Sequence, residues 1–200
     1  MDSSAAMPVP HAVPGPVLLG HDTLVMQQIT GFMSNDFDIL DGTGEQVIGH
    51  VTTSGGGVSR FFAGSRSLDV ADADGTPLLH VEDPPDIGLD RFELSTPDGA
   101  PLAEVTSKLA FFSTRVGIAV AGGPSLELNG DMLGMDFTFE VEGFVAATVA
   151  RQWGGLSRGF LGHSRYVLAI DPTAPPQLRL AIIGGCIVLD LIRQKKSRSN

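Results

Sequence analysis

The sequence predicts a mostly β fold, with about twelve antiparallel strands forming a barrel around a buried hydrophobic C-terminal helix. Three observations lead to this fold class. A hairpin pattern recurs along the chain, 25 glycines and 13 prolines suit a protein with many tight turns, and one long apolar run lies near the C-terminus. The apolar share of 42% supplies a sizeable core and excludes wholesale disorder.

The recurring pattern is a strand, an acidic turn and a second strand. In each copy a glycine follows the first apolar residue by seven positions, and an apolar residue follows the glycine by three. The copies begin at Phe37, Leu68 and Phe92. Alternating apolar residues place one face of a strand in a core, and glycine supplies the positive φ that reverses the chain. The pattern therefore predicts three β-hairpins.

Other segments complete the predicted barrel. Asn129-Gly130 and Glu142-Gly143 each lie between alternating apolar residues, which predicts two more hairpins. Further strands are expected at 23–29, 58–63, 110–120 and 165–170. The regular spacing of these short strands is typical of a sandwich or barrel.

The apolar run covers residues 177–193, and residues 180–189 carry no charge. Ten uncharged residues are too few to cross a bilayer, which takes about 20. A helix that is apolar all round must still be buried, and Gly184 and Gly185 suit close contact with its surroundings. We therefore expect this helix to pass through the barrel. Asp190, inside the run, is expected to pair with an arginine or to accept hydrogen bonds from backbone.

The composition and the terminal segments limit which functions and cellular locations are expected. The net charge of -10 disfavours nucleic-acid binding, which needs clustered cations. Cys186 is the only cysteine, so the chain can form neither an internal disulfide nor a cysteine zinc site. Residues 1–16 lack the pattern of a secretory signal, so we expect a cytoplasmic protein that could also lie at the inner membrane face. Residues 1–19 are expected to form a flexible Pro-rich tail, and residues 20–195 a single domain.

No catalytic, metal or cofactor site is predicted. Gly155-Leu-Ser157-Arg-Gly159 matches a nucleophile elbow, but that motif belongs to an α/β sheet, and the pattern here is β. Asp72-Ala-Asp74-Gly75 resembles the start of a calcium loop, but Val70 and Val81 occupy positions where carboxylates belong. It is interpreted as a hairpin turn.

The candidate lipid-binding residues are basic and aromatic side chains near the C-terminus. Arg151 and Trp153 are two apart on a predicted strand and so share a face, and Arg158 follows them. Arginine pairs well with phosphate, although Arg151 could instead stack on an outward Trp153 to cover the barrel wall. The last eight residues add four cations, which could also be only a solubilising end: Arg193, Lys195, Lys196 and Arg198.

Two parts of the chain are similar to known families. Residues 149–158, 166–170 and 179–190 resemble the C-terminal third of phospholipid scramblases. Residues 26–28 and 37–47 resemble the LURP-one-related proteins. Both families belong to the tubby C-terminal-like superfamily, and the resemblance covers roughly residues 20–195. It implies a twelve-stranded barrel wrapped around a hydrophobic C-terminal helix.

The sequence departs from the scramblases at two features. The acidic calcium-binding stretch that precedes their last helix corresponds here to residues 163–171, which contain one carboxylate, and their acylated cysteine cluster is absent. Calcium needs six to eight oxygen ligands, so calcium regulation is not expected.

The resulting hypothesis is a non-enzymatic protein of the scramblase/LURP-one group that associates with anionic phospholipid or membrane. Scramblase activity is implied by the resemblance alone, and no nucleic-acid partner is expected. An alternative is a soluble protein-interaction or regulatory barrel with no lipid contact. A third, weaker alternative is a serine hydrolase that uses Ser157.

Overall fold

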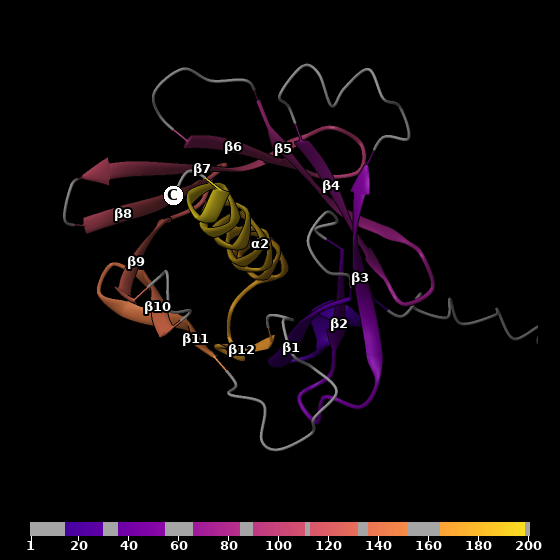
Figure 1. Cartoon of the computed structure of the whole chain (residues 1–200). Coiled ribbons are helices and arrows are strands. Elements are labelled where there is room, and N and C mark those ends of the chain that lie inside the picture. The colour runs from indigo at the N-terminus through magenta and orange to yellow at the C-terminus, as the bar shows by residue number, and fades with distance from the viewer. Residues whose placement is uncertain are drawn as a thin grey trace, which may run out of the picture.

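The computed structural model confirms the predicted fold: twelve antiparallel strands close into a barrel, and one long helix lies inside it (Figure 1). The structure describes residues 15–29, 36–54, 66–84, 90–110, 113–131, 136–151 and 165–198. The strands are β1 (Thr23–Gln28), β2 (Phe37–Leu40), β3 (Val47–Ser54), β4 (Arg66–Asp72), β5 (Pro77–Asp83), β6 (Asp90–Ser95), β7 (Pro101–Ala110), β8 (Ser113–Val120), β9 (Ser125–Asp131), β10 (Asp136–Val141), β11 (Phe144–Arg151) and β12 (Arg165–Ile170). The 3-10 helix η1 (Leu18–Gly20) precedes them, and helix α2 (Pro176–Arg198) follows.

The strands follow each other around the barrel in sequence order, and the first and last pair to close it. Thr23 lies opposite Ala169 and Gln27 opposite Arg165 in the β1–β12 ladder. Every strand therefore has two neighbours. Closure removes the exposed sheet edges that would otherwise offer backbone groups to other chains.

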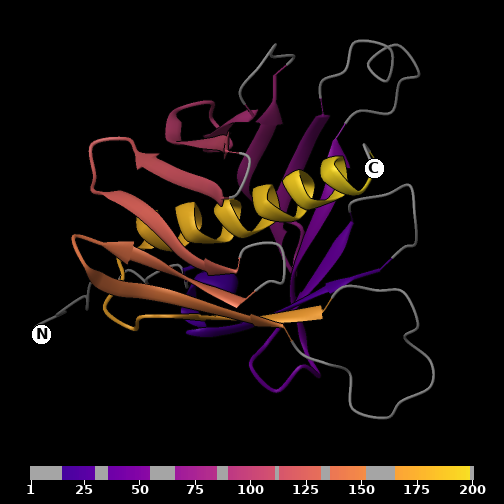
Figure 2. The ribbon, with the colours of Figure 1, turned by 60° about the vertical axis from the view of Figure 1, so that its left-hand side comes forward.

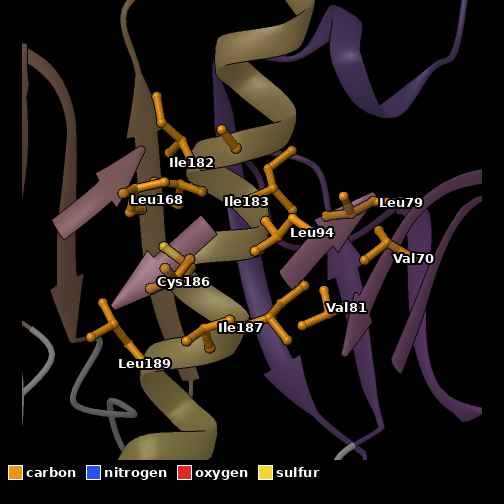
Figure 3. Packing of buried hydrophobic residues seen from close by; sticks show 14 of the residues in the cluster. Val70, Leu79, Val81, Leu94, Leu168, Ile182, Ile183, Cys186, Ile187 and Leu189 are labelled. Carbon is orange, nitrogen blue, oxygen red and sulfur yellow. The ribbon is translucent and has the colours of Figure 1, made fainter. Parts of the chain in front are cut away.

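Helix α2 runs along the barrel axis and supplies the centre of the core (Figures 1 and 2). All side chains from Ala181 to Ile192 are buried. Figure 3 shows Ile183, Cys186 and Ile187 of the helix among barrel residues that include Leu79, Val81 and Leu168. The prediction of a helix that passes through the barrel is confirmed, because an all-apolar helix finds barrel wall on every side.

The two helix glycines lie where the barrel wall comes nearest. A Cβ atom at Gly184 would overlap the Leu94 side chain and lie 2.9 Å from Leu79 Cδ2. A Cβ atom at Gly185 would lie 2.5 Å from Ile118 Cδ1. Since interiors are close-packed, larger residues would force the helix and wall apart.

The three predicted hairpin turns are confirmed. Gly44, Gly75 and Gly99 have φ of 73°, 85° and 84°. Each glycine N–H donates to the carbonyl three residues earlier, over 2.9, 2.9 and 2.8 Å. The predicted turn at Glu142-Gly143 is also present, with φ of 51° and 85°.

The predicted turn at Asn129-Gly130 is wrong. Both residues lie within β9 and pair with Thr138 and Phe137 of β10. A Cβ atom at Gly130 would lie 2.7 Å from the Asp136 carbonyl oxygen and 2.8 Å from Phe137 Cα. The glycine therefore permits close approach of two strands rather than a chain reversal. The strand predicted at 58–63 lies outside the described residues.

Arg179 fixes the start of α2 to the barrel. Its side chain is buried and donates hydrogen bonds to the carbonyls of His21 and Ala174, over 3.0 Å each, and it forms an ion pair with Asp22. A buried guanidinium is tolerated when its donors have acceptors. These contacts join the first turns of the helix to the start of β1.

Candidate functional site

The barrel has two ends that differ in structure (Figure 2). All even-numbered strands finish at one end, where tight turns lead to the next element and where α2 begins; we call it the turn end. At the opposite end, which we call the exit end, α2 leaves the barrel. The strand connections at the exit end lie outside the described residues.

Basic residues are nearly confined to the exit end. Among the described residues, every lysine and arginine except Arg179 lies within three residues of a strand terminus at that end or in the last turns of α2. They are Arg66, Arg91, Lys108, Arg115, Arg151, Arg165, Arg193, Lys195, Lys196 and Arg198. Carboxylates, in contrast, occur at both ends of the barrel. The uneven distribution of basic residues therefore makes the exit end more positive than the turn end.

Arg151, one of the predicted lipid-binding residues, is exposed at the last position of β11. In the β11–β12 ladder it lies directly opposite Tyr166, a residue that is fully buried inside the barrel. Val149 and Leu168 form the preceding inward pair of the same ladder. Strand alternation therefore places Arg151 on the lumen-facing side, at the rim of the exit end. The alternative, in which Arg151 stacks on Trp153, stays a prediction, because Trp153 lies outside the described residues.

Tyr166 faces a polar stripe on helix α2. Cys186, Asp190 and Arg193 are spaced by four and three residues, so they share one face of the helix. Burial raises the pKa of Tyr166 well above its usual value; Cys186 and Asp190 raise the pKa further, and Arg193 lowers it. The phenol therefore lies within electrostatic reach of all three helix residues.

The buried polar member of this stripe is Asp190, which accepts a hydrogen bond from Arg193 Nη2 over 2.9 Å. The Arg193 side chain is 22% exposed, so its guanidinium connects a buried carboxylate to the surface. The predicted pairing of Asp190 with an arginine is confirmed. The Tyr166 hydroxyl, in contrast, has no hydrogen-bond partner among the described residues.

The structure brings some of the predicted residues together. Arg151 and Arg193 both lie near Tyr166, and the α2 backbone continues through Lys195, Lys196 and Arg198 beyond the barrel core. Trp153, Arg158 and Ser157 lie outside the described residues, so their predicted roles stay predictions. Sequence reasoning missed Tyr166, and the sole signal was a lone tyrosine among apolar neighbours on a predicted strand.

The outer wall carries a groove of about 600 Å³ across β5 to β8. Glu82, Glu93 and Glu104 lie side by side in register along it. Arg91 bridges two of them, at 3.3 Å to Glu93 and 2.9 Å to Glu104. Like charges directly opposite each other are destabilising, and one arginine offsets part of that repulsion.

Two cross-strand pairs on the outer wall hold the described histidines of β3 and β5. His50 Nδ1 lies 2.9 Å from Asp38, and His80 Nδ1 lies 2.7 Å from Asp69. In the part of the chain that the structure describes, no three histidine, cysteine or carboxylate side chains are arranged to hold a metal ion. None of the described helices is both long and apolar enough to span a membrane.

Comparison with known proteins agrees with this architecture. The chain resembles a crystal structure of an Arabidopsis thaliana protein, with a TM-score of 0.57 at 15% sequence identity. The likeness covers 89% of this chain and 99% of that one, and at this identity it shows the fold alone. No curated protein matches the sequence. The model of the LURP-one-related family matches residues 22–190. The chain therefore belongs to the LURP-one-related family, whose barrel fits the tubby-like superfamily.

Proposed function

We propose that this protein is a non-enzymatic LURP-one-related barrel that associates peripherally with anionic phospholipid through its exit end. The observation that carries the proposal is that all described basic residues except Arg179 lie at that end. Each lysine or arginine near an anionic surface contributes about 1 kcal/mol, and the attraction fades within a Debye length of about 10 Å. The acidic turn end would face away from the lipid.

Helix α2 gives the basic tail a fixed base. The helix runs unbroken to Arg198, and its first part is anchored by Arg179 and by the packed core. Lys195, Lys196 and Arg198 are thus carried on a helix that cannot move far from the exit end. Arg193 has a second role, because it compensates the buried charge of Asp190.

The test is flotation of the intact protein with vesicles of phosphatidylcholine alone or mixed with phosphatidylserine. We expect binding to the anionic vesicles at low salt, and loss of binding at high salt. The variant Lys195→Gln/Lys196→Gln/Arg198→Gln should lose binding while its melting temperature stays unchanged. The matched control Lys195→Arg/Lys196→Arg/Arg198→Lys keeps the charge and should still bind.

Two results would count against the proposal. If the protein does not float with anionic vesicles even at low ionic strength, the proposed association with anionic phospholipid is contradicted. Equal binding by the neutralised and intact proteins would show that the tail is not the contact, and would move the test to Arg151.

A second candidate function is a protein-interaction barrel, and one observation favours it. Phe144 is 78% exposed and Val145 is 48% exposed, immediately after the Glu142-Gly143 turn at the turn end. An exposed phenylalanine at a hairpin tip suits contact with an apolar surface. The variant Phe144→Ser should leave vesicle binding unchanged, because the turn end is not the lipid contact. Loss of flotation in that variant would instead place lipid at the turn end.

A further inference from the structure

A short segment before the first strand closes the turn end of the barrel. Leu18, in η1, is fully buried and belongs to the core. It packs on Gly49 of β3, where an added Cβ atom would lie 3.3 Å from Leu18 Cδ2. Gly49 pairs with Asp72 across the β3–β4 ladder, and the pair two residues further along is fully buried in the core, so Gly49 faces the lumen. We call residues 17–20 the plug, because Leu18 fills the lumen beside β3 and β4.

Asp72 holds the plug by its backbone. Its two carboxylate oxygens accept hydrogen bonds from the N–H groups of Val17 and Leu18, over 2.7 and 2.9 Å. The first N–H groups of a helix have no acceptor within the helix, so the aspartate supplies acceptors that the segment itself lacks. Asp72 is itself buried, and hydrogen bonds to a buried carboxylate are among the stronger ones in proteins. One side chain therefore fixes the start of the plug.

The plug lies outside the hydrogen-bonded sheet. Within the described residues, the sheet begins at β1, and the backbone hydrogen bond of the plug joins its own residues, from the Gly20 N–H to the Val17 carbonyl. Val17 and Gly20 are exposed, and Leu19 packs only partly against the core. The plug is thus attached mainly by Leu18 and by the two hydrogen bonds to Asp72. Few buried contacts and few backbone hydrogen bonds are features of segments that open locally.

The chain immediately after the plug is fixed to the start of α2. Arg179 donates a hydrogen bond to the His21 carbonyl over 3.0 Å and forms an ion pair with Asp22. Gly20 lies between this anchor and the rest of the plug, and a Cβ atom there would meet nothing within 4 Å. Rotation about the Gly20 backbone can therefore move residues 17–19 while the anchor and β1 stay in place.

We propose that residues 17–20 form a hinged plug that is held shut by Asp72 and opens separately from the rest of the fold. Opening uncovers the Asp72 carboxylate and the apolar mouth of the barrel beside Gly49. The strands and α2 keep their places. This device lies at the end opposite to the lipid contact and does not depend on it.

Amide hydrogen exchange of the full chain, followed by NMR, tests separate opening. The Val17 and Leu18 N–H groups report on the plug, because they are the groups that Asp72 binds. The N–H of Ile183, within α2, reports on the core. We expect protection factors in the plug that are at least about 10-fold smaller than that of Ile183, yet well above those of an unfolded peptide. Equal protection at all three amides, or no protection in the plug, would overturn the proposal.

Ile187→Val distinguishes local opening from global unfolding. Loss of one methylene from the centre of the core should speed exchange at the Ile183 amide by about 2–10-fold. Exchange at Val17 and Leu18 should not change, because the plug opens without unfolding of the core. If all three amides exchange faster by the same factor, the plug opens only when the whole fold does, and the proposal is wrong.

Asp72→Asn tests what holds the plug shut. Asparagine presents an amide donor where one carboxylate oxygen accepted, so exchange at Val17 and Leu18 should become about 10–100-fold faster. Asp74→Asn is the matched control, because it removes the same charge from the same turn, yet its carboxylate accepts from the Thr76 N–H over 2.9 Å. The control should leave exchange in the plug unchanged. The same effect of both variants, or no effect of Asp72→Asn, would contradict the proposed role of Asp72 and overturn the device.

Discussion

Gly184 illustrates how a single residue adapts the helix to the barrel. In a helix interior, glycine is about 1 kcal/mol less favourable than alanine. Here that cost is offset by contact, because a Cβ atom would collide with Leu94 and crowd Leu79. A glycine that lowers helix propensity thus permits the closest packing of helix against wall.

Replacement of this glycine should destabilise the fold. Gly184→Val is expected to lower the free energy of unfolding by about 1–3 kcal/mol or more, because the added methyl groups overpack the core. Gly20→Val is the control, since a Cβ atom at Gly20 meets nothing within 4 Å. Its effect should stay within about 0.5 kcal/mol. Denaturant unfolding measures both, and equal stability of the two variants would mean that the helix is packed less tightly than described.

The Asp190–Arg193 pair should show strong coupling. Arg193→Gln removes the guanidinium that pairs with the buried Asp190 carboxylate and should cost about 1–3 kcal/mol, less than for a fully buried pair because Arg193 is partly exposed. Adding Asp190→Asn to this variant should recover part of the loss. A double-mutant cycle measures the interaction, and strict additivity would show that the two side chains do not depend on each other.

At the scale of elements, the turns at the turn end share one type of hydrogen bond. In four turns an aspartate and a threonine two residues apart are joined by hydrogen bonds: Asp41 with Thr43, Asp74 with Thr76, Asp98 with Thr96, and Asp171 with Thr173. These hydrogen bonds to threonine are the largest cause of the lowered pKa of each carboxyl group. Ionised aspartate is therefore the form that the folded turns favour.

These turns should make the free energy of unfolding depend on pH in the acidic range. Because the folded pKa values lie below the ordinary value of 3.8, the stabilisation is complete above about pH 4 and is lost as pH falls through the folded values. Unfolding free energy measured from pH 5 to pH 2 should fall with acid. Replacing all four aspartates with asparagine should flatten that dependence. An unchanged slope would assign acid sensitivity to other carboxylates.

Local elements could be predicted from the sequence because their signals are local. Alternation around Phe37, Leu68 and Phe92 and the glycines that follow were enough for three hairpins, and the uncharged run was enough for the buried helix. The pattern around Gly130 predicts a turn, whereas its actual role depends on how closely β10 approaches, which the residues around it do not encode.

The candidate site was predictable only in part, for the same reason. The basic residues are visible in the sequence, but which of them meet depends on the β11–β12 register and on where α2 lies in the barrel. That register turns Arg151 inward, opposite Tyr166. No spacing within one segment contains this information, because residues 152–164 separate the two strands.

At the scale of the whole molecule, the closed barrel and its helix leave the ends as the chemically distinct surfaces. The interior is filled by apolar side chains from all strands and from α2. The turn end carries ionised carboxylates and the apolar tip at Phe144, whereas the exit end carries the cations. Association with an anionic surface through the exit end therefore requires no opening of the barrel.

Thiol labelling of Cys186 tests this account most directly. Cys186 is the only cysteine, lies in the middle of α2 and is fully buried; burial raises its pKa, so little thiolate forms at pH 8. Ellman's reagent should label the native protein at least about 100-fold more slowly than the protein in denaturant, because reaction requires opening of the core. Anionic vesicles that bind the protein should leave this protection unchanged. Fast labelling of the native protein, or labelling that accelerates when vesicles are added, would contradict a helix held inside a closed barrel.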